Sequence, residues 1–371
     1  MKIAIMVGTR PEAIKMAPIV KAFRAKTQYE IILCSTGQHK DMLAQALQDF
    51  GLVPDVDLGV MTHGQTLAQL TENLMNRLAS FYESFQPDWV FVQGDTTTVF
   101  VASLVAFYHK VKVAHVEAGL RSFDKFSPFP EEVNRKLTSV LADVHFTPTS
   151  LSKANLLAEG VAENRVVVTG NTVIDALLSM RDSVQGKLEL LPATVKGLIE
   201  ANKKIVLCTT HRRENWGKPL HNICSALLDV VAAHEDVSIV LPVHLNPVVR
   251  NTIEKRLGGH ERIVLIAPQP YRNFVLLMSH AHVILSDSGG VQEEAPSLDV
   301  PVLIMRDNTE RPEGVESGVT KLVGTQRFAI SSALSTLLQD KDVYQKMVAT
   351  ENPYGNGTAA RQIVEFFKNY A

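Results

Sequence analysis

Short apolar runs alternate with amphipathic segments along the whole sequence, and this alternation constrains the fold more than any other feature. The first six runs, which we interpret as strands, are Lys2–Val7, Ile31–Ser35, Trp89–Gln93, Val111–Glu117, His145–Thr147 and Val166–Thr169. The next six are Lys204–Thr209, Val237–Leu241, Ile263–Ile266, Val283–Ser286, Val302–Met305 and Lys321–Val323. A helical pattern follows each run, which predicts right-handed βαβ units and parallel sheets.

The length of the chain predicts two domains, because 371 residues exceed what one typical hydrophobic core supports. We place the junction after the sixth strand, near Gly170-Asn171-Thr172. The N-terminal domain then covers residues 1–170 and the C-terminal domain residues 171–356. The predicted fold class is α/β, with two Rossmann-like, doubly wound parallel-sheet domains facing a cleft.

Composition excludes several classes of protein. A hydrophobic content of 46% and a charged content of 20% are typical of a globular protein. The net charge of -2 provides no basic stripe for nucleic acid and no polybasic membrane patch. No apolar run reaches membrane-spanning length, and the first strand is too short for a secretory signal. Cys34, Cys208 and Cys224 lie in apolar stretches without a C-x-x-C pair, which favours reduced thiols in a cytoplasmic protein.

Polar residues follow directly after several predicted strands. In open parallel sheets, ligands bind beyond the carboxyl ends of the strands, so these positions are candidate site residues. They are Arg10, Asp95, Glu117, His211 and Ser288, joined by Glu131 in the first turn of a predicted helix. Three carboxylates on the first half and a basic, glycine-rich edge on the second predict an acid/base cleft over an anion site.

One corner of the second half has the features of that anion site. The strand Val283–Ser286 is followed by Ser288-Gly289-Gly290, and a helical pattern begins at once. Such a turn exposes unpaired backbone N–H groups at the positive end of a helix dipole, and glycine lets a phosphate approach closely. Glu294, further along this helix, could accept the hydroxyls of a ribose.

Each candidate also has a purely structural interpretation. Asp95 could be a helix N-cap, and Glu131 could form a surface salt bridge with Arg135 at i,i+4 spacing. His211 could belong to a solvated basic corner, and the Ser-Gly-Gly turn could be an ordinary corner between strand and helix. Glu117 is harder to explain in this way, because it ends an apolar strand and small residues that shield it little follow it.

Several familiar motifs are missing or incomplete. The sequence has no G-x-G-x-x-G after the first strand and no G-x-x-x-x-G-K-[ST], so neither a dinucleotide site nor a P-loop is indicated. The stretch Asp287–Gly290 also occurs around serine-protease nucleophiles, but those proteins are β-barrels. His280 and His282 form an H-x-H pair without a third ligand, so no metal is expected.

Six longer motifs, in order from the first strand to near the last helix, resemble those of the non-hydrolysing UDP-N-acetylglucosamine 2-epimerases. They are Gly8-Thr9-Arg10-Pro11-Glu12-Ala13-Ile14-Lys15, Gly94-Asp95-Thr96-Thr97-Thr98, His115-Val116-Glu117-Ala118-Gly119-Leu120-Arg121, Thr210-His211-Arg212-Arg213-Glu214-Asn215, Asp287-Ser288-Gly289-Gly290-Val291-Gln292-Glu293-Glu294-Ala295-Pro296 and Thr309-Glu310-Arg311-Pro312-Glu313. The resemblance implies a fold like that of the GT-B glycosyltransferases, with a final helix within residues 357–371 that packs back on the first domain. It also implies a homodimer that needs no cofactor.

The resemblance assigns roles to individual residues. The UDP moiety is held by Arg10, His211, Ser288, Gly289, Gly290, Glu294 and Arg311, and Gln269 and Phe274 match positions on the uracil side. Phe274 taken alone would more often be helix core. The catalytic set is Asp95, Glu117, Glu131, His211 and Lys15, of which Lys15, Asp95 and Glu117 would also contact the substrate.

In some family members a second substrate molecule activates the enzyme. Gln38 and His39 match that activator site, whereas Lys40 and Gly64 stand where the family pattern has arginine.

The resemblance implies reversible C2 epimerisation of UDP-N-acetylglucosamine to UDP-N-acetylmannosamine, for bacterial surface polysaccharide synthesis. The C2 hydrogen is not next to a carbonyl, so UDP must leave first, giving 2-acetamidoglucal, before the proton is returned and UDP re-added. Two carboxyl groups on opposite faces of the sugar would move the proton. The alternatives are an epimerase of a modified UDP-sugar such as a diacetamido-uronic acid, a hydrolysing variant that releases free N-acetylmannosamine, and a non-enzymatic UDP-sugar sensor.

Overall fold

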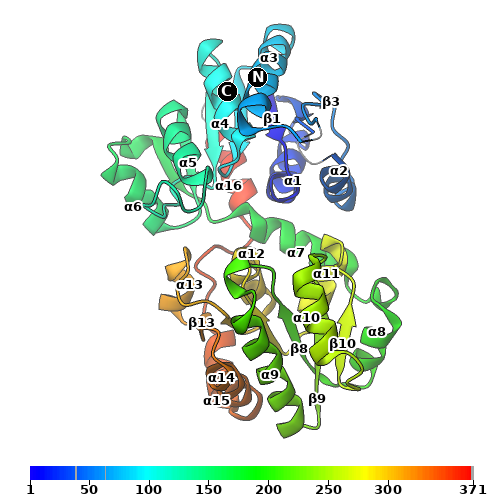
Figure 1. Ribbon diagram of the computed structural model, residues 1–371. Coiled ribbons are helices and arrows are strands. Elements are labelled where there is room, and N and C mark those ends of the chain that lie inside the picture. Colours follow the sequence, from blue (N-terminus) through cyan, green and yellow to red (C-terminus); the bar gives the residue numbers. More distant parts are fainter. Residues whose placement is uncertain (38–39, 63, 369–371) are drawn as a thin grey trace. The chain divides into compact units, whose positions relative to one another are not determined.

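The computed structural model describes residues 1–37, 40–62 and 64–368. The chain forms two compact units (Figure 1). Unit 1 consists of Met1–Ala176 together with Tyr354–Ala371, and unit 2 consists of Leu177–Pro353. Each unit is an α/β layer structure around a parallel sheet, which confirms the predicted fold class.

Within the described residues, unit 1 contains a sheet of seven parallel strands in the order β3-β2-β1-β4-β5-β6-β7. The strands are β1 Lys2–Val7, β2 Glu30–Ser35, β3 Val56–Asp57, β4 Trp89–Gln93, β5 Lys112–Val116, β6 Val144–Thr147 and β7 Val166–Val168. The helices are α1 Arg10–Arg24, α2 Lys40–Asp49, α3 Leu67–Phe85, α4 Thr97–Tyr108, α5 Glu131–Leu141, α6 Ser150–Ala158 and α16 Ala359–Lys368, together with the start of α7 Thr172–Val184, which continues into unit 2. A 3-10 turn, η1, spans Glu163–Arg165. The edge strand β3 was not predicted, because it consists of only two residues, Val56 and Asp57, which form no apolar run. These residues pair with Cys34 and Ser35 of β2.

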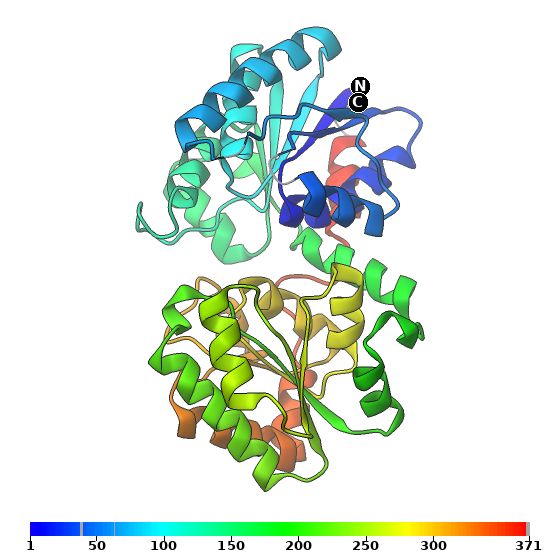
Figure 2. The same cartoon turned by 45° about the vertical axis from the view of Figure 1, so that its right-hand side comes forward.

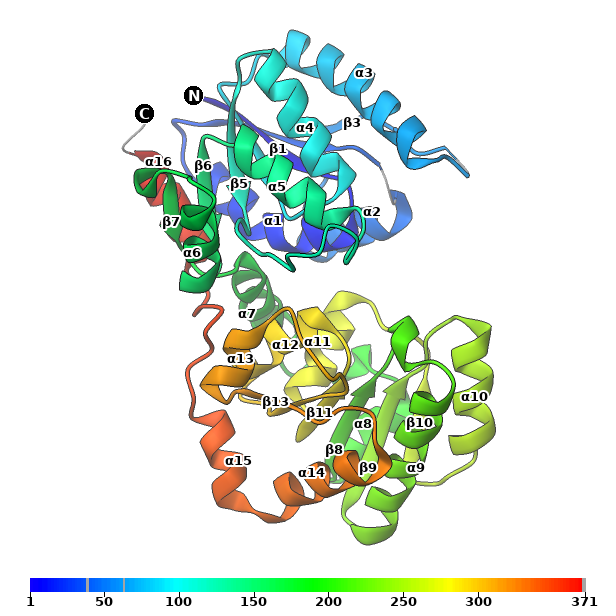
Figure 3. The same cartoon turned by 60° about the vertical axis from the view of Figure 1, so that its left-hand side comes forward.

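The final helix α16 belongs to unit 1 although it is encoded at the end of the chain. It packs beside α1, and its red ribbon lies among the elements of unit 1 in Figures 1 and 3. Phe367 is fully buried there, with ring centroids 4.9 Å from Trp89, 5.0 Å from Phe91 and 5.9 Å from Phe23. Burial of one such side chain stabilises a fold by about 1.5–3 kcal/mol, so α16 completes the core of unit 1.

Unit 2 contains, within its described residues, a sheet of six parallel strands in the order β10-β9-β8-β11-β12-β13 with helices on both faces (Figure 2). The strands are β8 Lys204–Thr209, β9 Val237–Pro242, β10 Ile263–Ile266, β11 Val283–Ser286, β12 Val302–Ile304 and β13 Thr320–Leu322. The helices are α8 Ala193–Glu200, α9 Lys218–Ala233, α10 Pro247–Leu257, α11 Tyr271–Ser279, α12 Gly289–Glu294, α13 Pro312–Ser317, α14 Arg327–Gln339 and α15 Lys341–Val348, with 3-10 turns η2 Leu188–Leu190, η3 Arg213–Asn215 and η4 Ala295–Leu298.

The boundary between the units falls inside helix α7, a few residues after the loop at Gly170 that the sequence indicated. The start of α7 is tied to the returning chain within unit 1. The backbone N–H of Asn171 donates to the carbonyl of Tyr354 at 2.7 Å, and Asp175 accepts the N–H groups of Ala359 and Ala360 at the start of α16. These contacts explain why the first residues of α7 belong to unit 1.

Candidate active site

Both sheets reverse their strand order next to the strand that begins the unit. In unit 1, strands β2 and β3 lie on one side of β1, and β4 lies on its other side. In unit 2, strands β9 and β10 lie on one side of β8, and β11 lies on its other side. A crevice forms beyond the carboxyl ends of the strands at such a switch point, and ligands of open α/β sheets bind there. The candidate residues after β1, β4, β8 and β11 therefore lie at two switch points, one in each unit.

The loop after β1 in unit 1 is held by Glu12. Its side chain accepts hydrogen bonds from the backbone N–H groups of Gly8 and Thr9, which forms a capping box at the start of α1. The hydroxyl of Thr96, in the loop after β4, donates to Glu12 Oε1 at 2.6 Å. Glu12 thus joins the loops after β1 and β4, and α1 carries Arg10 at its first residue and Lys15 one turn later.

Glu117 is held by side chains from several segments of unit 1. The expectation that small neighbours leave it poorly shielded is wrong, since only 8% of the residue is exposed. It lies just beyond β5 in the left-handed backbone region, with φ 61°. Lys15 forms an ion pair with its Oε1, Gln93 donates to its Oε2, and Asn171 donates to Oε1 at 2.8 Å. Groups from three further segments of unit 1 therefore orient this carboxylate.

Asp95 follows β4 and is paired with Arg135 from helix α5. The Nε and Nη2 atoms of Arg135 lie 2.9 and 2.8 Å from Oδ2 of Asp95. Asp95 is not the N-cap of α4, because that position is taken by Thr96, whose hydroxyl accepts from the N–H of Val99. The interpretation of Asp95 as a helix N-cap is therefore wrong.

Glu131 is the first residue of α5 and follows Pro130. The proposed salt bridge with Arg135 does not form, since Arg135 pairs with Asp95 and Glu132 instead. The Oε2 atom of Glu131 is buried and has no hydrogen-bond partner among the described residues. A buried carboxylate oxygen without a partner costs free energy, which indicates that a ligand or a water molecule normally completes its contacts.

The switch point of unit 2 is organised by Asp287, which comes directly after β11 and is fully buried. Its carboxylate accepts hydrogen bonds from the hydroxyl of Thr210, the backbone N–H groups of His211 and Arg212, and the side chain of Asn215, at 2.9–3.2 Å. The Nδ1 atom of His211 lies 2.9 Å from Oδ1. Burial raises the pKa of Asp287, but the hydrogen bond and charge of His211 and the backbone donors lower it overall to about 2.

His211 is therefore anchored on one side and exposed on the other, because 43% of its side chain is accessible. The contact of Nδ1 with Asp287 orients the ring, which leaves Nε2 as the nitrogen directed away from this anchor. The structural interpretation of His211, as part of an exposed basic turn, does not explain its contact with the buried Asp287.

The Ser288-Gly289-Gly290 turn starts the short helix α12, with Ser288 as N-cap. A Cβ atom on Gly289 would lie 2.6 Å from Nη1 of Arg311, so only glycine allows the guanidinium this close to the turn. Glu293, which is 1% exposed, holds Arg311 through an ion pair with Nε. The structure thus brings a cation and the first backbone N–H groups of a helix together, as an anion site requires.

The remaining candidates of unit 2 lie on or near α11 and α12. Glu294 is 7% exposed and accepts a hydrogen bond from the hydroxyl of Tyr271 at 3.0 Å. Gln269 donates to the carbonyl of Ala267 at 2.7 Å, and Phe274 lies half-buried within α11. The candidate activator residues Gln38 and His39 lie outside the described residues.

Comparison with known proteins gives a consistent answer. The family model described as UDP-N-acetylglucosamine 2-epimerase matches residues 21–368. The UDP-N-acetylglucosamine 2-epimerase of Escherichia coli (strain K12) is 50% identical over 371 residues, which cover 100% of this chain and 99% of the relative. That of Yersinia pestis is 50% identical over 372 residues, with 100% and 99% covered.

A crystal structure of UDP-GlcNAc 2-epimerase from Neisseria meningitidis bound to UDP-GlcNAc is also similar. It is 46% identical, has a TM-score of 0.89, and each chain is covered over 100% of its length. The chain belongs to the UDP-N-acetylglucosamine 2-epimerase family. The family resemblance stated from the sequence motifs is therefore confirmed.

Several residues at the two switch points of this epimerase family member were missed by reasoning from the sequence. Asp287 and Glu12 lie inside quoted motifs without an assigned role, and Glu12 had a signal, the Thr-x-x-Glu spacing of a capping box. Arg135 was considered only as a partner of Glu131. Gln93 and Asn171 had no signal beyond their position next to a strand end, because their partner Glu117 is distant in sequence.

Within the part of the epimerase chain that the structure describes, His, Cys, Asp and Glu side chains do not gather in any group of three or more that could hold a metal ion. None of its helices combines the length and the apolar character needed to span a bilayer.

Replacement of Glu12 by glutamine should alter how stability depends on pH. Burial raises the pKa of Glu12 to about 7, against the opposing effect of its hydrogen bonds from Thr96, Gly8 and Thr9. The folded state then binds a proton that the unfolded state has lost, so this carboxyl contributes stability below pH 4.5 that is lost as the pH rises towards 7. The change amounts to on the order of 3 kcal/mol.

Urea unfolding between pH 4.5 and 8 measures this effect. Relative to Glu12→Gln, the wild type should lose stability as the pH rises, because glutamine has no proton to lose and still accepts the two backbone hydrogen bonds. Parallel pH dependences for the two proteins would contradict the role given to Glu12.

Proposed function

We propose that this protein is an enzyme that interconverts UDP-N-acetylglucosamine and UDP-N-acetylmannosamine by reversible epimerisation at C2. One observation carries the proposal beyond family membership: the three candidate carboxylates of unit 1, Asp95, Glu117 and Glu131, each have a different setting. A site that only bound UDP would need none of them. Carboxylates with different partners can divide the roles of proton acceptor and proton donor.

In the proposed reaction the bond between C1 and the diphosphate breaks first, and its electron pair leaves with UDP. The C2–H bond then breaks, its electron pair forms the C1=C2 double bond of 2-acetamidoglucal, and a carboxylate of unit 1 takes the proton. A second carboxyl group returns a proton to the opposite face of C2, and UDP adds back to C1. Lys15, paired with Glu117, would hold that carboxylate in place for the reaction.

The switch point of unit 2 would hold the departing UDP. Arg311 and the first N–H groups of α12 supply positive potential beside Ser288, Gly289 and Gly290, which suits a diphosphate. His211, anchored by Asp287, would donate to the same group. This assignment explains why the guanidinium is held so close to Gly289.

The other contacts to UDP follow from the family pattern. Glu294 would accept the ribose hydroxyls, Gln269 and Phe274 would contact the uracil, and Arg10 would also hold the UDP moiety. The hydrogen bond from Tyr271 to Glu294 supports the first of these roles, because it fixes the orientation of the carboxylate.

We further propose a homodimer in the cytoplasm that supplies UDP-N-acetylmannosamine for bacterial surface polysaccharides. Three large apolar side chains are exposed: Phe107 (60%) and Tyr108 (61%) of α4 and Val140 (82%) of α5. A second subunit that covered them would remove this apolar surface from water. Three buried free thiols suit a reducing compartment.

The test is to incubate the purified protein with UDP-N-acetylglucosamine in D₂O and to follow the products by NMR. The proposal expects UDP-N-acetylmannosamine, with deuterium at C2 and the nucleotide still attached. Free N-acetylmannosamine as the main product would mean a hydrolysing enzyme. Turnover confined to a diacetamido-uronic acid derivative would mean a different substrate, and UDP-sugar binding without exchange at C2 would mean a sensor.

A further inference from the structure

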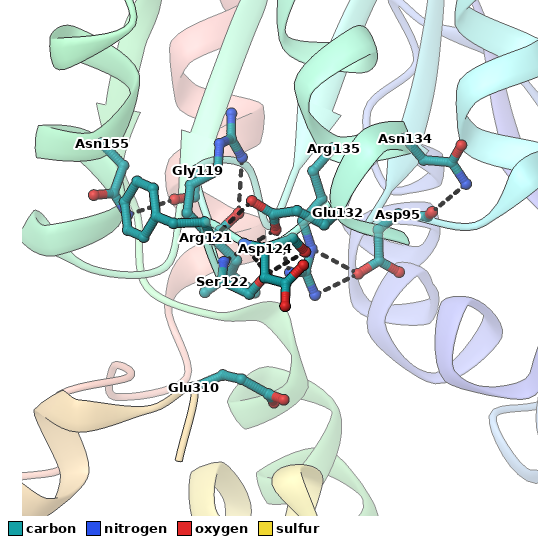
Figure 4. Close-up of polar contacts among 12 residues, drawn as sticks. Asp95, Gly119, Arg121, Ser122, Asp124, Glu132, Asn134, Arg135, Asn155 and Glu310 are labelled. Carbon is teal, nitrogen blue, oxygen red and sulfur yellow. Dashed lines mark hydrogen bonds and ion pairs between the residues drawn. The ribbon is translucent and has the colours of Figure 1, made fainter. Parts of the chain in front are cut away.

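Helix α5 carries a series of polar contacts that ends on Asp95 (Figure 4). Arg135 approaches Asp95 through Nε at 2.9 Å and Nη2 at 2.8 Å, and both atoms contact Oδ2. No described residue forms a hydrogen bond with Oδ1 of this carboxylate, which points away from the guanidinium. The arginine therefore holds one oxygen and leaves the other for a reacting group.

The second arm of Arg135 reaches a buried carboxylate. Its Nη1 donates to Oε2 of Glu132 at 3.1 Å, and Glu132 is 1% exposed. Glu132 also accepts the backbone N–H groups of Ser122 at 3.0 Å and Phe123 at 3.1 Å. Phe123 has φ 62°, so Glu132 stabilises a loop whose backbone lies in a disfavoured region. This loop connects β5, which ends next to Glu117, with α5.

The same helix also fixes the backbone at Asp95. Asn134 donates from Nδ2 to the carbonyl oxygen of Asp95 at 2.9 Å. Glu131, with its unpartnered buried Oε2, is the first residue of this helix. One rigid element thus sets the positions of two of the three carboxylates at the unit 1 switch point.

We propose that Arg135 is a positioning residue for proton transfer at Asp95, and that Glu132 couples this arginine to the loop before α5. The inference deepens the proposed epimerisation and rests on it. With Oδ2 held by Arg135, Oδ1 of ionised Asp95 exchanges the proton at C2: it takes the proton as the C–H electron pair forms the double bond of the glucal, and it returns the proton when the reaction runs backwards.

Among the described residues, Asp95 and Glu132 form ion pairs with the guanidinium, and His115 interacts with it electrostatically. Asp95 comes from the loop after β4, Glu132 comes from α5, and His115 comes from β5. Burial lowers the pKa of His115 to about 4, so this histidine is neutral at pH 7. One cation thus serves two carboxylates, those of Asp95 and Glu132.

Arg135→Gln tests the role of the cation. We expect kcat to fall by about 10- to 100-fold with KM changed by no more than about threefold, because the group acts on the reacting carboxylate rather than on UDP. The acid limb of the pH profile of kcat should move to higher pH, since the variant lacks the cation that contacts Asp95 in the native protein. Arg135→Lys should recover part of the rate, because an ammonium still pairs with Asp95.

Glu132→Gln should shift the acid limb of the pH profile of kcat in the opposite direction. Without the competing carboxylate, Arg135 acts more strongly on Asp95, so the acid limb should move to lower pH. Arg327→Gln is the matched arginine control, because it removes an exposed ion pair with Asp229 in unit 2 and should leave kcat and the pH profile unchanged. If circular dichroism shows that Arg135→Gln does not fold, the inference is tested with Arg135→Lys and Glu132→Gln instead.

The possible outcomes are distinct. Opposite shifts of the acid limb in the Arg135 and Glu132 variants support the inference. A lower kcat with an unchanged pH profile and no recovery by lysine would overturn it in favour of a purely structural role, and so would an unchanged kcat. Failure of the wild type itself to form UDP-N-acetylmannosamine would instead overturn the proposed function.

Discussion

Asp95→Asn is expected to lower kcat for epimerisation by about a thousandfold while changing the affinity for UDP by less than about twofold. The amide has nearly the shape of the carboxylate, and its oxygen can still accept from Arg135, whose contacts lie at 2.8 and 2.9 Å in the native protein. An amide cannot take up a proton at C2. The variant therefore separates proton transfer from nucleotide binding.

The rate is measured by exchange of the C2 hydrogen with D₂O, and the affinity for UDP by isothermal titration calorimetry. Asp229→Asn is the matched control, because Asp229 forms an exposed ion pair with Arg327 and should be replaceable without effect on either quantity. Glu131→Gln should behave like Asp95→Asn. A parallel loss of UDP affinity in these variants would show that the carboxylates bind the nucleotide, and the assigned roles would be wrong.

The second large effect is expected at Asp287, where asparagine should destabilise unit 2 by about 3–5 kcal/mol and abolish UDP binding. The native carboxylate is fully buried and accepts hydrogen bonds from Thr210, His211, Arg212 and Asn215. Asparagine turns one acceptor into a donor, which then faces other donors in a buried site. The loop that carries His211 would lose its anchor.

Urea unfolding and titration with UDP measure the two parts of this prediction. Asp236→Asn is the control, because Asp236 forms an exposed ion pair with Lys204 in the same unit. The folded pKa of Asp287 is lowered to about 2, so its contribution to stability is present above the unfolded pKa of 3.8 and is lost only as the pH falls towards 2. Normal stability and UDP affinity in Asp287→Asn would contradict the anchoring role.

The strands and the ends at which the polar residues lie could be predicted because they depend on local pattern. Predicted strands such as Trp89–Gln93 and Lys204–Thr209 match the structure, since a buried parallel strand is a continuous apolar run in the sequence. The two-residue strand β3 was missed because it has no such run. Small neighbours made Glu117 appear unshielded, whereas Lys15, Gln93 and Asn171 surround it.

The sequence by itself determined the α/β class, the family, and the set of residues at the strand ends, because these are properties of periodicity and of motifs contiguous in the chain. Only the tertiary structure decided which of those residues meet. Arg135 reaches Asp95 across 40 positions and Asp287 holds His211 across 76, because the order of strands in each sheet brings distant loops to one edge. A single sequence encodes each side chain but not its partner, so the environment of each carboxylate follows from the fold alone.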